Sequence, residues 1–226
     1  MNNIAIICNI LNKELCEKSK EFYKNTKYDK IDIPGKNKMF GWKFLNFITY
    51  NLNYEWVILI DEDCFITDFS IVDELLQYQI KNNIYCSGVP DGGVLNTRKH
   101  NPISINPFFS ILNLKEIKKI YNKNDAELLF KQPDKFKNKA PFELLKSDYK
   151  FDSFEKYYGY FFQLISKDLK ILYLDGGDFY KKNDIWTSTI KFNNKIFAYH
   201  TWKARFYDKE KNRIDNIYKL CKKIAK

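Results

Sequence analysis

The sequence predicts an α/β protein with a mostly parallel central sheet and helices on both faces. Short apolar runs of strand length alternate with longer segments of helical periodicity, which is typical of parallel sheets joined by crossover helices. One run, residues 56–60, is wholly apolar, as expected of a strand that is buried on both faces. With 226 residues, 45% of them hydrophobic, the chain is long enough for one sizeable core.

The first part of the chain carries the alternation most clearly. Predicted strands cover residues 3–10, 29–33, 55–61 and 84–88. Predicted helices between and after them cover residues 13–25, 39–51 and 72–82.

After Gly88 the alternation breaks. Residues 89–107 contain Gly92-Gly93 and three prolines, which predicts a long surface loop. A strand at 108–112 and a helix at 114–121 follow, and residues 122–150 show no clear period. We then expect an aromatic-rich helix to residue 166, opened by Asp152 or Ser153 as its cap, and strands at 170–175 and 195–200.

Positive charge is concentrated at the C-terminal end. The formal net charge is +10, and residues 203–226 hold nine basic side chains against three acidic ones. Apolar residues recur there at helical spacing, which predicts a basic amphipathic helix at 207–226. We expect this helix to pack on the domain with its basic face in solvent. Contact with an anionic membrane surface or a phosphorylated ligand is the alternative.

Other features concern the compartment. The N-terminal apolar run has no basic lead-in and no cleavage site, and no apolar segment is long enough to cross a bilayer. The five cysteines form no CxxC pair, which disfavours a zinc site or a disulfide framework. We therefore expect a cytoplasmic protein with reduced thiols, at most peripheral to the inner face of the membrane.

Three acids, Asp61, Glu62 and Asp63, end the apolar run at 56–60. In an open parallel sheet, ligands bind at the carboxyl ends of the strands, so the position favours a site. Side chains at i and i+2 of an extended segment share a face, so Asp61 and Asp63 can point together while Glu62 points away. Two carboxylates on one face provide part of a site for Mg²⁺ or Mn²⁺ bound to a phosphate. Capping of the next helix is the alternative.

The stretch WVILIDEDCFI resembles the D-x-D signature of glycosyltransferases with the nucleotide-sugar-binding GT-A fold. The resemblance covers about residues 1–205 in element order, and D-x-D is its specific part. It implies a Rossmann-like, nucleotide-sugar-binding half at 1–88 and an acceptor half at 89–206, before the helix at 207–226. A Lys- and Gly-bearing helix precedes the D-x-D strand in that family, here GKNKMFGWKFLNF, with Lys43 as a candidate donor-binding residue.

The resemblance also implies roles for individual residues. Asp61 would contact the ribose or the metal, and Asp63 would bind the metal that bridges the diphosphate of a nucleotide sugar, with UDP-sugars favoured. His200 matches a late metal or diphosphate ligand of the family, although a packed histidine at a strand end is the alternative. Lys203 and Arg205 follow it and could neutralise the leaving diphosphate.

An inverting enzyme also needs a general base, and the family often places an acid before the helix of the acceptor half. Asp152 and Glu155 lie there, and we prefer Asp152, although the D-x-x-E spacing is also that of a capping box. A retaining mechanism would need neither acid. In the 89–107 segment, Asp91, Arg98 and His100 could hydrogen-bond sugar hydroxyls.

The predicted function is thus metal-dependent sugar transfer from a nucleotide sugar to a glycan or lipid-linked acceptor, in synthesis of surface polysaccharides or glycoconjugates. A nucleotidyltransferase is an alternative, but it would show a glycine-rich loop after the first strand, and IAIICNILNKEL has no glycine. A non-enzymatic basic protein that binds sugar or nucleic acid is another alternative. The absence of a nucleic-acid-binding signature disfavours nucleic acid.

Overall fold

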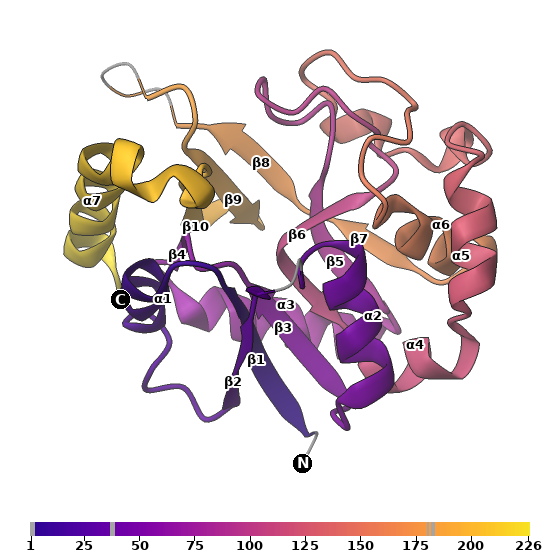
Figure 1. Ribbon diagram of the computed structural model, residues 1–226, viewed down its shortest axis with the longest axis horizontal. Helices are drawn as coiled ribbons and strands as arrows, with labels where there is room; N and C mark the ends of the chain where they lie inside the picture. Colours follow the sequence, from indigo (N-terminus) through magenta and orange to yellow (C-terminus); the bar gives the residue numbers. More distant parts are fainter. Residues whose placement is uncertain (1–2, 37–38, 180, 182–183) are drawn as a thin grey trace.

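The computed structural model describes residues 3–36, 39–179, 181 and 184–226. The strands are β1 (Ile4–Ile10), β2 (Asp29–Pro34), β3 (Trp56–Ile60), β4 (Cys64–Ile66), β5 (Cys86–Pro90), β6 (Ile105–Leu112), β7 (Ile171–Tyr173), β8 (Asp175–Asp178), β9 (Ser188–Phe192) and β10 (Lys195–His200). The α-helices are α1 (Lys13–Lys20), α2 (Trp42–Asn51), α3 (Phe69–Asn82), α4 (Leu114–Ile120), α5 (Lys123–Phe130), α6 (Tyr158–Ser166) and α7 (Tyr207–Ile224). Figure 1 shows their arrangement.

The central sheet confirms the predicted fold class. Within the described ranges it has six strands in the order β2-β1-β3-β6-β5-β7. β6 runs antiparallel to both of its neighbours, and the other pairs are parallel. The sheet is therefore mixed but mostly parallel, and consistent with a Rossmann-like fold.

Side chains alternate between two cores on the two faces of this sheet. On one face, Ile7, Val57 and Leu59 pack in a cluster with residues of α2, α4, α5 and α6. On the other face, Ile58 and Ile60 pack with α3 and with the second sheet. This alternation follows from the period of two along a strand, and burial on both faces explains why β3 is apolar throughout.

A second sheet, which the sequence did not predict, covers part of that face. Its order in the described chain is β4-β10-β9-β8, and all of its pairs are antiparallel. The segment 170–175, expected as one strand, divides between the two sheets: β7 pairs with β5, and β8 pairs with β9. β4 is only three residues long, and β8 has the sequence DGGD, so neither carries the usual strand signal.

The basic C-terminal helix packs on the domain as expected. Ile214, Ile217 and Cys221 of α7 are buried in a cluster with Leu15 of α1 and Phe65 of β4. An ion pair from Lys18 to Asp215 links α1 to α7, and a second from Lys222 to Glu21 links α7 to the residue that follows α1. The two helices lie side by side in Figure 1. Among the helices of the described residues, none is both long and apolar enough to cross a membrane.

The segment 89–107 is not the surface loop that was expected. Residues 89–95 and 101–106 are buried, and only residues 96–100 and Pro107 reach solvent. Gly92 forms an isolated bridge with Lys99, and a Cβ at Gly92 would lie 1.8 Å from the carbonyl oxygen of His100. Glycine is needed here because the segment folds tightly back on itself and lets the two backbones touch.

Two helix predictions also need correction. The segment 122–150 contains α5, capped by the Asn122 side chain, which accepts hydrogen bonds from Asn124 and Asp125. The aromatic helix begins at Tyr158 rather than at Asp152 or Ser153. The Ser153 hydroxyl donates to the Phe130 carbonyl at the end of α5, so it does not cap α6.

The close packing of α6 against α5 generates a stability prediction. A Cβ at Gly159 would lie 2.2 Å from the backbone oxygen of Ala126, so Gly159→Ala must push the helices apart. We expect the free energy of unfolding to fall by about 1–3 kcal/mol because of this overpacking. Without the close contact, alanine in place of glycine inside a helix would usually raise it by about 1 kcal/mol. In the control, Gly177→Ala, the nearest atom is 3.5 Å away. Urea unfolding measures both variants, and equal stabilities would contradict the packing.

Candidate functional site

The three acids stand in a tight turn at the carboxyl end of β3. The Asp61 amide donates to the Phe108 carbonyl at 2.8 Å, which continues the β3–β6 ladder. The Cys64 amide then donates to the Asp61 carbonyl at 3.0 Å and closes the turn before β4. The strand therefore changes direction at the acids and crosses from the large sheet to the small one.

The small sheet brings His200 to this turn. β4 pairs antiparallel with β10, with His200 opposite Cys64. The Thr201 amide and hydroxyl both donate to the Asp63 carbonyl, at 2.9 and 3.1 Å. His200 Nε2 consequently lies 3.0 Å from Asp63 Oδ1.

Asp61, Asp63 and His200 form a group that could hold a metal ion. Their ligand atoms all lie within 4.8 Å of one another. Asp63 and His200 are buried, and the His200 ring stacks on Phe108 with centroids 4.0 Å apart and planes at 6°. His200 Nδ1 is buried and has no partner among the described residues. Two carboxylates and an imidazole are a donor set that fits Mn²⁺ or Mg²⁺ completed by phosphate oxygens.

The electrostatics of Asp61 also favour a cation. Burial raises the pKa of Asp61 well above its usual range, and the negative charges of Asp63 and Glu62 raise it further. Arg205 opposes this shift, but it is the smallest influence. A divalent cation would stabilise the ionised form of Asp61, because it offsets the repulsion among the acids.

Glu62 has a separate structural role. Its Oε2 accepts hydrogen bonds from the amides of Leu11 and Asn12, at 2.8 and 2.7 Å. This carboxylate thereby ties the end of β1 to the end of β3. Burial raises the pKa of Glu62 to about 7, although the two amides oppose the shift. Glu62 is thus engaged by backbone amides and lies outside the metal-binding group, although it lines the same cleft as Asp61 and Asp63.

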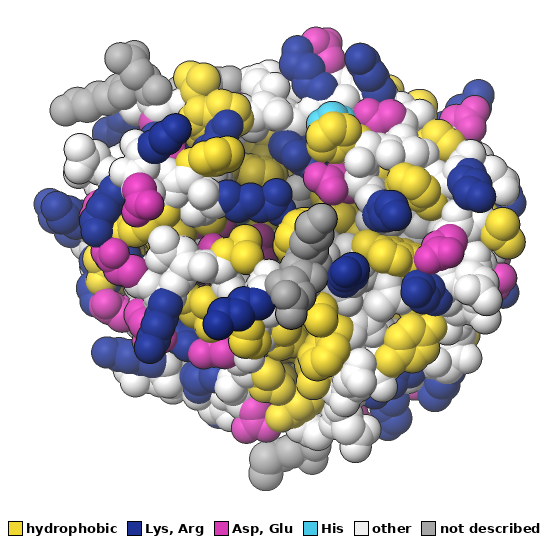
Figure 2. Space-filling view, viewed as in Figure 1, with side chains coloured by type: hydrophobic (Ala, Val, Ile, Leu, Met, Phe, Trp, Pro, Cys, Tyr) yellow, Lys and Arg dark blue, Asp and Glu magenta, His cyan; other side chains and the backbone are white. Residues whose placement is uncertain are grey.

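These residues lie in a cleft of about 310 Å³. Figure 2 shows the molecule in the same view as Figure 1. A hollow lies near the middle of this face, with Lys, Arg and hydrophobic side chains around it. Candidate residues from the sequence that line the cleft are Asp61, Asp63, Arg98, Glu155, His200, Lys203 and Arg205. The structure thus brings together most of the site residues named from the sequence.

Aromatic rings support the cations of the cleft. The ammonium group of Lys203 lies 3.8 Å from the centre of the Trp186 ring, and the guanidinium of Arg205 lies 4.5 Å from that of Phe40. Such contacts hold a long basic side chain in place while its charge remains available to a ligand. Trp186 and Phe40 were not named from the sequence, where single aromatics carry no distinguishing signal.

Arg98 lines the cleft, whereas Asp91 holds Arg98 in place from outside the cleft. Its Nη2 donates to both oxygens of Asp91 at 2.7 Å, and its Nε donates at 3.0 Å. Asn106 and Tyr158 donate to the same carboxylate. Asp91 has no exposed surface and does not line the cleft, so its position fits orientation of Arg98 rather than contact with sugar hydroxyls.

Asp152 and Glu155 face different surroundings. Asp152 contacts His100, with 3.0 Å between Oδ2 and Nδ1, and does not line the cleft. Glu155 does line it, half-buried, and burial together with the charge of Asp91 raises the pKa of Glu155. Lys43 is exposed on α2 outside the cleft. Asn37 and Lys38 of the same Lys- and Gly-bearing segment lie outside the described residues.

No protein-family model and no curated protein matches the chain. Among solved structures, the chain is similar to A197 from STIV, at 8% identity and a TM-score of 0.40, over 54% of this chain and 70% of that one. It is also similar to a glycosyltransferase involved in the glycosylation of the major capsid of PBCV-1, at 13% identity and a TM-score of 0.34, over 65% of this chain and 79% of that one. Likenesses of this degree say nothing of what the chain does.

The Asp61, Asp63 and His200 group generates a binding prediction. We expect Mn²⁺ alone to raise the melting temperature of the wild-type chain. At a free Mn²⁺ concentration ten times the dissociation constant, the free energy of unfolding should rise by about 1.4 kcal/mol. Asp63→Asn should remove this shift, because it replaces a charged ligand by a neutral one of the same shape. Asp152→Asn, which changes an acid outside the cleft, should leave the shift intact. Equal shifts in both variants would argue against the site.

Proposed function

We propose that the chain is a metal-dependent glycosyltransferase that moves a sugar from a nucleoside-diphosphate donor, with a UDP-sugar favoured, to an acceptor hydroxyl. One observation carries the proposal: Asp61, Asp63 and His200 converge in a cleft that Lys203 and Arg205 also line. A diphosphate needs both kinds of group, a metal held by hard ligands and fixed cations nearby.

In the proposed reaction, different residues of the cleft have different roles. Asp61, Asp63 and His200 would hold Mn²⁺ or Mg²⁺, which supplies charge neutralisation at the diphosphate. Lys203 and Arg205 would stabilise the charge that grows on the diphosphate as the bond from the sugar C1 to its phosphate oxygen breaks. Because aromatic rings already hold both side chains, little reorganisation is needed when that charge appears.

For an inverting reaction, Glu155 is a better candidate base than Asp152. Its carboxylate would take the proton of the acceptor hydroxyl while that oxygen forms a bond to C1 and the nucleoside diphosphate departs. Its raised pKa brings it closer to neutral pH, where a general base works best. Asp152, by contrast, is engaged with His100.

The acceptor is proposed to be a glycan or a lipid-linked sugar, as in synthesis of surface polysaccharides. A lipid-linked acceptor would suit a chain whose C-terminal helix carries exposed lysines, such as Lys209, Lys219 and Lys223, near an anionic inner membrane face. This part of the proposal depends on charge alone.

A nucleotidyltransferase is disfavoured by a specific contact. Enzymes of that kind cradle phosphates on backbone amides after the first strand. Here the amides of Leu11 and Asn12 are already bound by the Glu62 carboxylate. A phosphate would have to compete with a buried negative charge at that position.

A donor screen tests the proposed function. We expect Mn²⁺ together with one UDP- or GDP-linked sugar to raise the melting temperature more than either alone, and to release free nucleoside diphosphate. EDTA should remove both effects. If no UDP- or GDP-linked sugar stabilises the chain in a metal-dependent way, the proposal is wrong.

The pH profile tests the base. A general base works only when deprotonated, so the rate should fall as pH drops through the raised pKa of Glu155, above its ordinary 4.5. Glu155→Gln should lower kcat by about 10²- to 10⁴-fold, leave donor KM nearly unchanged and remove this acidic limb. Asp152→Asn is the matched control. A variant Glu155→Gln with the wild-type rate and profile would exclude Glu155, and loss in Asp152→Asn alone would support Asp152.

A further inference from the structure

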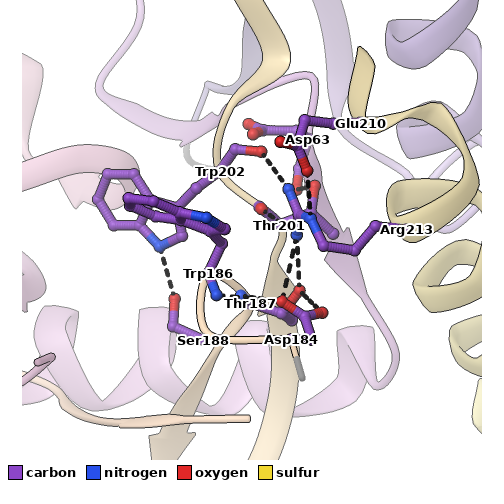
Figure 3. Close-up of polar contacts among 9 residues, drawn as sticks. All are labelled: Asp63, Asp184, Trp186, Thr187, Ser188, Thr201, Trp202, Glu210 and Arg213. Carbon is purple, nitrogen blue, oxygen red and sulfur yellow. Dashed lines mark hydrogen bonds and ion pairs between the residues drawn. The ribbon is translucent and has the colours of Figure 1, made fainter. Parts of the chain in front are cut away.

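Arg213 of α7 does not line the cleft, yet it contacts the segment that carries His200 and Lys203, which do. Its Nη1 donates to the Thr201 carbonyl at 2.7 Å, and its Nη2 donates to the Trp202 carbonyl at 3.2 Å. Figure 3 shows the guanidinium between this segment and a second loop. The two carbonyls stand directly between His200 and Lys203 in the chain.

The second loop carries Trp186. Arg213 Nη1 donates to the Thr187 hydroxyl at 3.1 Å and lies 3.4 Å from Asp184 Oδ1. The same Asp184 oxygen accepts from the amides of Trp186 and Thr187, at 3.1 and 2.9 Å. Arg213 therefore joins the loop of Trp186 to the turn of Lys203 through one planar group (Figure 3).

The charge of this arginine is balanced within the same contacts. Its Nε donates to Glu210 Oε2 at 2.7 Å, one turn earlier on α7, and Asp184 provides a second carboxylate. The Arg213 side chain is only 17% exposed, so these partners replace much of its hydration. A planar guanidinium offers five N–H donors toward these partners, whereas an ammonium group offers three and has no such fork.

The turn that Arg213 binds is strained. Trp202 and Lys203 have φ of 54° and 67°, a left-handed backbone that non-glycine residues rarely adopt. Such residues persist only where the surrounding contacts hold them. Here the contacts include the Thr201 bonds to the Asp63 carbonyl, the bond from the Trp202 indole to the Ser188 hydroxyl, and the Arg213 bonds to the two carbonyls.

We infer that Arg213 is a positioning residue that holds Lys203 against Trp186, so that the Lys203 ammonium is fixed for an anionic phosphate in the cleft. Both partners of the 3.8 Å contact between Lys203 and Trp186 are joined to Arg213, one through the Trp202 carbonyl and one through Thr187 and Asp184. Arg213 itself does not line the cleft. The inference rests on the proposed function, which supplies the diphosphate as the anion.

A double-mutant cycle with UDP and Mn²⁺ as the probe tests the inference. Arg213→Gln should weaken UDP binding about tenfold, the loss of roughly one charge-assisted contact. In a Lys203→Ala background the same change should add less than about twofold, because its effect passes through Lys203. Binding of Mn²⁺ alone should stay as in the wild type. Equal losses in both backgrounds would overturn the inference.

Amide hydrogen exchange without ligand separates positioning from loss of structure. In Arg213→Gln, exchange should become faster at residues 201–206 while α7 and β9 keep their protection. Loss of protection throughout α7 would mean that Arg213 only supports the helix, and the inference would fall. If the wild-type chain binds no nucleoside diphosphate, the proposed function falls and takes the inference with it. Wild-type binding that Arg213→Gln leaves unchanged overturns the inference alone.

Discussion

The antiparallel pairing of β4 with β10 is the constraint on which the site depends. Asp63 and His200 are 137 positions apart in the chain, and they meet because His200 stands opposite Cys64 in this pairing. β4 has only three residues, so its own hydrogen bonds could not hold β10 in place. The small sheet gains its stability from β9 and from apolar residues packed on the face of the large sheet, such as Ile190 and Ala198. The geometry of the cleft is therefore a property of the junction between the two sheets.

The cleft combines buried acids with cations held by aromatic rings. Burial of carboxylates is costly unless each finds a partner. Glu62 has two backbone amides, and Asp63 has His200, whereas Asp61 is left with a strongly raised pKa. Lys203 and Arg205 form no ion pair with these three acids, and their charged groups lie over aromatic rings instead. Opposite charges thus remain separate within one cleft, an arrangement that complements a metal-bound phosphate.

Much of the fold and of the candidate site could be predicted from the sequence, but some parts could not. Periodicity alone located β1, β2, β3 and the helices between them. The helices bury one face and β3 is buried on both faces, and each case leaves a regular apolar pattern in the sequence. The D-x-D stretch named Asp61 and Asp63 as candidate ligands and the resemblance named His200, and the structure brings these three side chains together. The small sheet was missed because β4 is too short and DGGD too glycine-rich to give a strand pattern. The 89–107 segment was misjudged because glycine and proline mark turns, whether a turn is exposed or buried. The contacts of Arg213 could not be foreseen, since a single arginine on an amphipathic helix carries no sign of which carbonyls it reaches.

The late position of β10 and α7 in the chain also bears on biosynthesis. Asp61 and Asp63 leave the ribosome long before His200, and Arg213 follows later still. A chain that ends before β10 already contains β1, β2, β3, β5 and β6 of the large sheet, but it lacks the third candidate ligand and Arg213. The acids would meanwhile be exposed to solvent or paired with nothing in particular. The cleft is therefore complete only when the last strand and helix dock, and a chain truncated before β10 would hold Asp61 and Asp63 without His200.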